Sequence, residues 1–193
     1  MKLSVCVYCG SKFGGSPAYL AAAQSLGRLI GERGWRMVYG GGNVGLMGAT
    51  ADAAMAAGAE VVGVIPERLL QLEVGHRHLT ELHVVTTMHE RKRLMAELAT
   101  VFVALPGGIG TFEELFEVWT WRHLGYHDQP IGLLNVEGFY DPLLAFMHHT
   151  RQAGFIDAHQ QAMLTVDTDP ATLLDRLANE AGRSTRPEDF SET

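Results

Sequence analysis

Short apolar runs alternate along the chain with longer stretches in which apolar residues recur every three or four positions. The short runs cover residues 3–8, 35–39, 60–65, 82–86, 100–105, 129–135 and 162–166. Most are rich in β-branched residues and end close to glycine or proline, so we predict that each forms a β-strand. The first run shows little alternation of apolar and polar residues, which is typical of a parallel strand that is buried on both faces.

The stretches between these runs predict helices. Ser16 is a candidate N-cap, and Pro17 after it starts a helix that stops near Gly34. Further helices are expected at residues 49–57, 88–98, 139–153 and 170–177, and from Phe112 onward. Residues 66–82 are the least regular, and we interpret them as a connecting loop or lid.

This alternation of strands and helices predicts an α/β protein, a Rossmann-like three-layer α/β/α sandwich with a largely parallel sheet. The 193 residues are enough for one substantial core, so we expect a single domain at residues 1–180. Residues 181–193 are interpreted as a polar C-terminal tail.

The net charge of −7 argues against a nucleic-acid polymer as partner, because such binding depends on neutralising many phosphates with Lys and Arg. A mononucleotide needs only a local pocket and is not excluded. No apolar run approaches the ~20 residues of a membrane span, so no membrane partner is expected. The first residues enter a strand pattern without a signal-peptide core, which predicts a cytoplasmic location.

Two cysteines, Cys6 and Cys9, stand three residues apart in and after the first predicted strand. Residues three apart on a strand point to opposite faces, so we interpret both thiols as structural. His76 and His78 lack a third ligand at suitable spacing, and no metal site is predicted.

The segment from Leu105 to Glu114, LPGGIGTFEE, follows a buried strand and opens a helix. Glycines at such a turn leave backbone N–H groups and the positive end of the helix dipole free to meet a phosphate. The candidate phosphate-binding residues are Gly107, Gly108, Ile109, Gly110 and Thr111.

Two further glycine-rich turns follow predicted strands. One contains Gly10 and Ser11, although for Ser11 alone a plain loop is an equal interpretation. The other, residues 40–48, contains Gly41 and Gly42 but differs in spacing from the dinucleotide fingerprint, and no acidic residue ends the next strand. We therefore reject NAD as a ligand. Because all these turns follow parallel strands, they are expected to converge at one edge of the sheet.

Arg91 falls within the apolar stripe of its predicted helix, where an arginine is costly unless a carboxylate or phosphate meets it. A structural ion pair and a ligand contact are equally compatible with this spacing. Lys92 and Arg93 by themselves indicate a solvated face. Glu114 lies in the first turns of the helix after the glycines, on a stripe shared with Trp121, which is consistent with a solvent-facing acid, a site wall or a subunit interface.

Two motifs resemble those of the Lonely Guy family, phosphoribohydrolases that act on cytokinin riboside 5′-monophosphates. They are the Pro-Gly-Gly-x-Gly-Thr-x-x-Glu segment ending at Glu114 and the Met-x-x-Arg-Lys segment at residues 88–92. The resemblance runs from about Val5 to about Leu177.

This resemblance implies a homodimer that releases a free base and ribose 5-phosphate from a nucleoside monophosphate, with no metal or organic cofactor. Arg91 and Glu114 would be catalytic, with Arg91 paired to Glu114 and keeping it ionised. The glycine turn would bind the 5′-phosphate. The remaining substrate contacts would be Glu73, Met88, Lys92 and Thr120.

Other functions remain open at this point. One is a nucleosidase whose substrate is AMP, and another is a non-catalytic carrier of a phosphorylated cofactor such as a molybdopterin. A carrier would have no need to keep Arg91 and Glu114 together with both motifs. A pyridoxal-phosphate lysine decarboxylase is rejected, because Lys2, Lys12 and Lys92 are the only lysines and Lys92 adjoins the candidate catalytic arginine.

Overall fold

The computed structural model describes residues 2–73, 75, 76, 78–183, 189 and 190, without the side chains of residues 71–73. Within them, seven parallel strands form one sheet in the order β4-β3-β2-β1-β5-β6-β7. The strands are β1 (Ser4–Tyr8), β2 (Arg36–Tyr39), β3 (Glu60–Pro66), β4 (Glu81–Val85), β5 (Val101–Ala104), β6 (Ile131–Leu134) and β7 (Leu164–Asp167). This confirms the predicted α/β sandwich, and the described sheet is entirely parallel.

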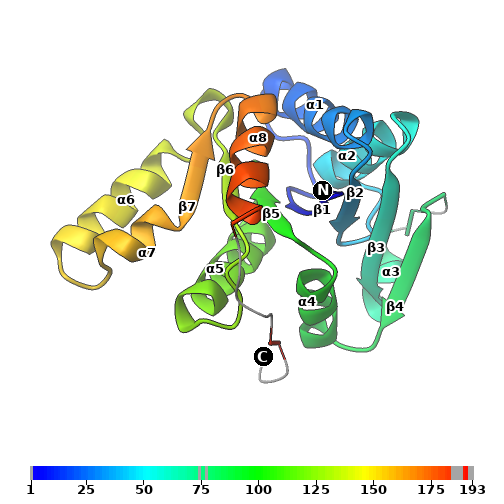
Figure 1. The fold of residues 1–193 in the computed structure, drawn as a ribbon. Helices are drawn as coiled ribbons and strands as arrows, with labels where there is room; N and C mark the ends of the chain where they lie inside the picture. Colours follow the sequence, from blue (N-terminus) through cyan, green and yellow to red (C-terminus); the bar gives the residue numbers. More distant parts are fainter. Residues whose placement is uncertain (1, 74, 77, 184–188, 191–193) are drawn as a thin grey trace.

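Helices cover both faces of the sheet, as Figure 1 shows. Those on one face are α1 (Pro17–Glu32), α2 (Gly45–Ala56) and α8 (Pro170–Ala181). The other face carries α4 (Met88–Glu97), α5 (Ile109–Leu124) and α6 (Asp141–Gln152). The shorter helices are α3 (Glu67–Glu73), α7 (Ala158–Ala162) and the single 3₁₀ turn η1 (Val136–Gly138).

Each face of the sheet has its own apolar core. Alternate residues of β1 divide between them, with Val5 and Val7 facing α1 and α2, and Cys6 and Tyr8 facing α4 and α5. Cys9 belongs to the first core, and both thiols are buried and free. The two cysteines therefore lie on opposite faces, as the spacing predicts.

The largest departure from the predicted elements is in residues 66–82. A short helix, α3, occupies part of the segment that we interpreted as a loop or lid. With seven residues it is too short to show helical periodicity, which is why the sequence pattern does not reveal it. The helix α7 was not predicted for the same reason, and α2 starts at Gly45, four residues earlier than expected.

One residue of the segment that we interpreted as a polar tail, Phe190, packs against the folded domain. Its side chain is buried, and its ring lies 5.9 Å from that of Trp121 and 5.7 Å from that of His127. The second stripe of α5, which contains Trp121, is thus covered in part from within the chain. No helix among the described residues is long and apolar enough to cross a membrane.

The strand order reverses between β1 and β5, since β2 to β4 continue on one side and β6 and β7 on the other. In open parallel sheets, ligands bind beyond the carboxyl ends of the strands at this switch point. Gly10 follows β1 and Pro106 follows β5, so the fold brings two predicted turns to this position.

Candidate active site

Three loops meet at the switch point through backbone hydrogen bonds. The Gly10 N–H donates to the Pro106 carbonyl at 3.1 Å, and the Gly10 carbonyl accepts from the Leu46 N–H at 3.0 Å. Gly45 has a φ of +57°, and a Cβ there would lie 2.3 Å from the carbonyl carbon of Ser11. Only glycine fits this approach. The expected convergence of the turns is confirmed for these loops.

The N-terminus of α5 is open. Gly108 is its N-cap residue, and no side chain caps the helix. A Cβ at Gly108 or Gly110 would meet nothing within 4 Å, and Ile109 is 87% exposed. The first N–H groups of a helix lack partners within the helix, so this turn presents donors and the positive dipole end to solvent. The arrangement suits an anion.

Gly107, unlike Gly108 and Gly110, has no space for a side chain. A Cβ there would lie 2.1 Å from Oγ1 of Thr111 and 2.9 Å from the backbone nitrogen of Gly10. Thr111 is itself buried beneath the turn. Gly107 and Thr111 therefore set the shape of the turn, whereas Gly108 and Gly110 leave space above it.

A pocket of about 330 Å³ adjoins this turn. Gly10, Ser11, Gly107 and Gly108, which the sequence analysis gives as candidate binding residues, line one part of it. The other part is largely apolar, and sequence reasoning missed it because its residues come from separate elements. This part is formed by Lys12, Phe13, Gly14, Tyr19, Leu46, Pro106 and Phe139.

Arg91 is buried in α4, as its position in the apolar stripe predicts. Its Nε donates to the Val64 carbonyl at 3.0 Å, and its Nη2 donates to the Gly40 carbonyl at 2.8 Å. Nη1 lies 3.9 Å from Sδ of Met88. A guanidinium has five N–H donors, so two backbone carbonyls fix its plane while other donors remain for a ligand.

Lys92 is also buried, which differs from the solvated face that its position indicates. Its Nζ donates to Oε1 of Glu113 and, at 2.8 Å, to Oε1 of Glu117. Burial alone would lower the pKa of Lys92, but these two carboxylates raise the pKa above its ordinary value. Lys92 is therefore a protonated bridge between α4 and α5.

Glu114 lies half-buried on α5 beside this cluster. Burial raises the pKa of Glu114 to about 7, because desolvation penalises the carboxylate. The positive charges of Arg91 and Lys92 oppose this rise, while Glu113 and Glu117 add to it. Among the described residues, no ion pair joins Arg91 to Glu114. The expected direct pairing is thus wrong, and burial outweighs the effect that was expected to keep Glu114 ionised.

Comparison with known proteins shows the family of this chain. The family model described as "possible lysine decarboxylase" matches residues 47–177. A cytokinin riboside 5′-monophosphate phosphoribohydrolase of Rhodococcoides fascians is 50% identical over 167 residues, which cover 86% of this chain and 84% of that relative. The protein of that name, LOG, from Oryza sativa subsp. japonica is 51% identical over 152 residues, or 79% of this chain and 63% of that relative. The chain belongs to the Lonely Guy family.

Solved structures with the same fold include a molybdenum cofactor binding protein from Rippkaea orientalis. It has a TM-score of 0.70 and 21% identity, covering 93% of this chain and 97% of that chain. The molybdenum cofactor carrier protein of Chlamydomonas reinhardtii has a TM-score of 0.71 and 19% identity, covering 94% of this chain and 99% of that chain. At these identities the likeness shows the fold alone.

The remaining residues expected from the Lonely Guy resemblance belong to other elements of the fold. Gly41 and Gly42 are buried just after β2, next to the Gly40 carbonyl that holds Arg91. Met88 is 41% exposed at the start of α4. Glu73 is the last residue of α3, and its side chain lies outside the described part of the chain.

Thr120, another expected site residue, lies apart from Glu114 on the same helix. It lies six residues after Glu114, which on a helix is about 9 Å along the axis and about 120° around it. Its side chain is exposed, and its hydroxyl donates to the Phe116 carbonyl at 2.7 Å.

Tyr140, which the sequence analysis does not single out, lies behind the glycine turn. The Tyr140 hydroxyl donates to the Leu105 carbonyl at 2.7 Å, directly before the turn. Its backbone N–H donates to Oδ1 of Asn135 at 2.7 Å, and Nδ2 of Asn135 donates to Oδ1 of Asp141 at 2.7 Å. These bonds hold the end of β5 in place. No spacing in the sequence indicates them, because the acceptor at Leu105 is a backbone atom.

Proposed function

We propose that this chain hydrolyses the N-glycosidic bond of adenosine 5′-monophosphates, with or without an N6 substituent, releasing a free base of the cytokinin or adenine type and ribose 5-phosphate. The main support for the proposal is that a single helix, α5, presents both a candidate phosphate site and a candidate catalytic carboxylate. The open N-terminus of α5 offers donors for the 5′-phosphate, and Glu114 follows Ile109 by about 7.5 Å along the axis. A ribose 5-phosphate can bridge such a gap. The names of the relatives at about 50% identity support the same reaction.

In this mechanism the ionised Glu114 stabilises positive charge that develops on the ribose as the glycosidic bond breaks. The same carboxylate orients the water that attacks the anomeric carbon. Arg91, held by the carbonyls of Val64 and Gly40, directs its free donors to the ligand and lowers the pKa of Glu114. Lys92 acts on Glu114 through its charge, because its Nζ is bound to Glu113 and Glu117.

The test is release of free base from purified protein offered AMP and isopentenyladenosine 5′-monophosphate side by side, with the two nucleosides as controls. We expect release from the monophosphates only, because the nucleosides lack the group that the α5 turn binds. The ratio of the two rates distinguishes cytokinin activation from AMP hydrolysis. Absence of release from every compound would refute the enzyme and favour a carrier of a phosphorylated cofactor.

Lysine decarboxylation is not supported by the environment of the lysines. A Schiff-base lysine must lose its proton to attack an aldehyde. Lys92, the lysine next to the site, is bound by two carboxylates that raise its pKa and keep it protonated. The cofactor would therefore meet an unreactive ammonium at this position.

We further propose that the active form is a homodimer. Thr120 is exposed about 120° around α5 from Glu114. The edge strand β4 carries the exposed apolar side chains of Leu82 and Val84, and the exposed Met88 begins α4. Exposed apolar groups close together favour association. Light scattering on the purified protein tests the proposal, and a mass of about 21 kDa in solution would contradict it.

A further inference from the structure

His76 is a buried histidine in the connection between α3 and β4. It is 4% exposed, and its Nε2 lies 2.8 Å from Oδ1 of Asp52 on α2. Its other ring nitrogen, Nδ1, is buried with no hydrogen-bond partner among the described residues. Burying a half-satisfied imidazole costs free energy, so a purely structural core would favour an apolar residue here.

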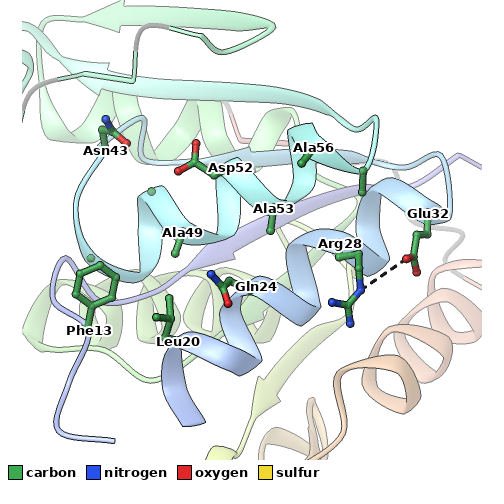
Figure 2. A pocket seen from close by; sticks show the side chains of 13 residues that line it. Phe13, Leu20, Gln24, Arg28, Glu32, Asn43, Ala49, Asp52, Ala53 and Ala56 are labelled. Atoms are coloured by element: carbon green, nitrogen blue, oxygen red, sulfur yellow. Dashed lines mark ion pairs between the residues drawn. The ribbon is translucent and has the colours of Figure 1, made fainter. Parts of the chain in front are cut away.

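The backbone around His76 lies across the glycines that follow β2. Gly75 forms an antiparallel bridge with Gly42, and the His76 N–H donates to the Gly41 carbonyl at 3.2 Å. We call residues Gly75 and His76 the strap. The His76 side chain attaches the strap to Asp52 of α2. Figure 2 shows Asp52 on the side of α2 that faces away from Gln24 of α1.

The glycines bound by the strap, Gly41 and Gly42, directly follow the residue that binds Arg91. Gly40 accepts the Nη2 hydrogen bond, and a Cβ at residue 40 would lie 1.9 Å from the same nitrogen. Gly41 has a φ of +75° and lies directly over β3, where a Cβ would be 3.2 Å from Cβ of Ile65. The guanidinium and the strap therefore bind the carbonyls of two consecutive residues, Gly40 and Gly41.

We propose that His76 and Asp52 are positioning residues for the reaction, acting on Arg91 through the strap and the Gly40–Gly42 backbone. This proposal rests on the proposed function. The pair anchors the strap to α2, and the strap binds Gly41 and Gly42 directly after Gly40. The Gly40 carbonyl, together with that of Val64, sets the plane of the guanidinium. Neither residue touches the ligand. Loss of the anchor would loosen Arg91 but leave the anion site at the N-terminus of α5 intact.

The first measurement is steady-state hydrolysis by His76→Ala and Asp52→Ala. We expect kcat to fall by about tenfold to a hundredfold, because small misplacements of a positioned group carry costs of this size. KM should change less than kcat, since the phosphate turn is unaltered. His76→Gln and Asp52→Asn keep a donor and an acceptor at the same ends, and they should recover most of the lost kcat.

Asp175→Ala is a matched control. Asp175 pairs with Arg33 at 2.8 Å, and its side chain is 65% exposed, the same values as for Asp52 in its pair with His76. It lies on α8, away from Arg91, and its removal should leave kcat unchanged. Values of kcat for the two alanine variants within twofold of the control would overturn the proposal. If the alanine variants do not fold, His76→Asn provides the test, because its shorter side chain cannot reach Asp52. An unchanged kcat in this variant would also overturn the proposal.

A second readout does not depend on turnover. The Arg91 Nε–H is bonded to the Val64 carbonyl and should give a protected arginine signal by NMR, assigned by its loss in Arg91→Lys. In His76→Ala we expect its exchange with solvent to accelerate by about tenfold, because the opposite side of the guanidinium has lost its support. Wild-type protein that releases no base would refute the proposed function, whereas an active wild type with unchanged kcat and exchange in the variants would refute the role of the pair alone.

Discussion

The guanidinium of Arg91 packs closely against the backbone of Gly40. Its Nη2 donates to the carbonyl of Gly40 at 2.8 Å, and a Cβ on residue 40 would lie 1.9 Å from that nitrogen. A buried guanidinium is tolerated only where its donors are satisfied. The glycine run after β2 thus provides an acceptor for the arginine as well as the space that the arginine occupies.

Gly40→Ala should therefore lower kcat by about a hundredfold, because the added methyl group must displace the guanidinium. Steady-state hydrolysis and thermal unfolding together test this. Gly15→Ala is the control, since a Cβ there meets nothing within 4 Å. An active Gly40→Ala protein would show that the position of Arg91 does not govern turnover.

Replacement of either catalytic residue should abolish hydrolysis while the fold persists. Glu114→Ala removes the carboxylate that stabilises charge on the ribose, and Arg91→Ala removes a cation that lowers the pKa of that carboxylate and whose free donors contact the ligand. Losses of this kind are on the order of 10²–10³ in kcat. Full turnover by either variant, with the circular dichroism of the wild type, would show that the roles are wrongly assigned.

Glu114 should also make the stability of the protein depend on pH. Its pKa is raised from 4.5 to about 7 in the folded state, so between these values the folded chain holds a proton that the unfolded chain has lost. The contribution of Glu114 is then fully present below pH 4.5 and is lost as the pH rises through 7. Glu114→Gln should gain about 1–3 kcal/mol over wild type at pH 8 and little at pH 4.5, measured by urea unfolding. An equal effect at both pH values would mean that the pKa is not raised.

The charge of Lys92 should set the pH at which the enzyme becomes active. If the carboxylate of Glu114 is the active form, kcat rises with pH through the pKa of that group. Lys92 lowers this pKa, so Lys92→Met should move the midpoint of the pH–rate profile upward. Lys2→Met, which removes an exposed lysine paired with Glu60, should leave the midpoint in place. A downward shift in Lys92→Met would be inconsistent with Glu114 acting as an anion.

Gly110→Ala and Gly107→Ala separate ligand binding from folding in the same turn. A Cβ at residue 110 meets nothing within 4 Å, so the fold should keep its stability while the methyl group raises KM for the monophosphate. At residue 107 the Cβ would lie 2.1 Å from Oγ1 of Thr111, and the protein itself should be destabilised by about 1–3 kcal/mol. Thermal unfolding combined with KM distinguishes the two outcomes, and an unchanged KM in Gly110→Ala would argue against phosphate binding at this turn.

The sequence predicts the layers of this fold well because parallel strands and their covering helices leave strong, repeated patterns. The glycine turn before α5 and the burial of Arg91 are also visible, since a turn and an apolar stripe are local features. By contrast, Lys92 and Glu117 are 25 residues apart in the chain and come into contact only when α4 and α5 pack together. The partners of Arg91 are backbone carbonyls, which carry no residue identity that a spacing could show.

The state of Glu114 depends on the sum of several such tertiary contacts. The resemblance suggests an ionised carboxylate beside an arginine, but the balance of burial and four neighbouring charges gives a pKa of about 7. Only the packed structure shows which of these opposing effects is larger.

The central position of β1 in the sheet also affects how the chain folds while it is being synthesised. The strands β1 to β4 leave the ribosome first and can pair as half of the sheet, but Val5 then has a neighbour only at Met37. Its second neighbour, Val101 on β5, is synthesised in the later half of the chain. Until then the nascent protein has an unpaired apolar strand edge, which is prone to associate with other chains. A chain truncated before Val101 should therefore aggregate during translation, and a chaperone that shields this edge should increase the yield of folded protein.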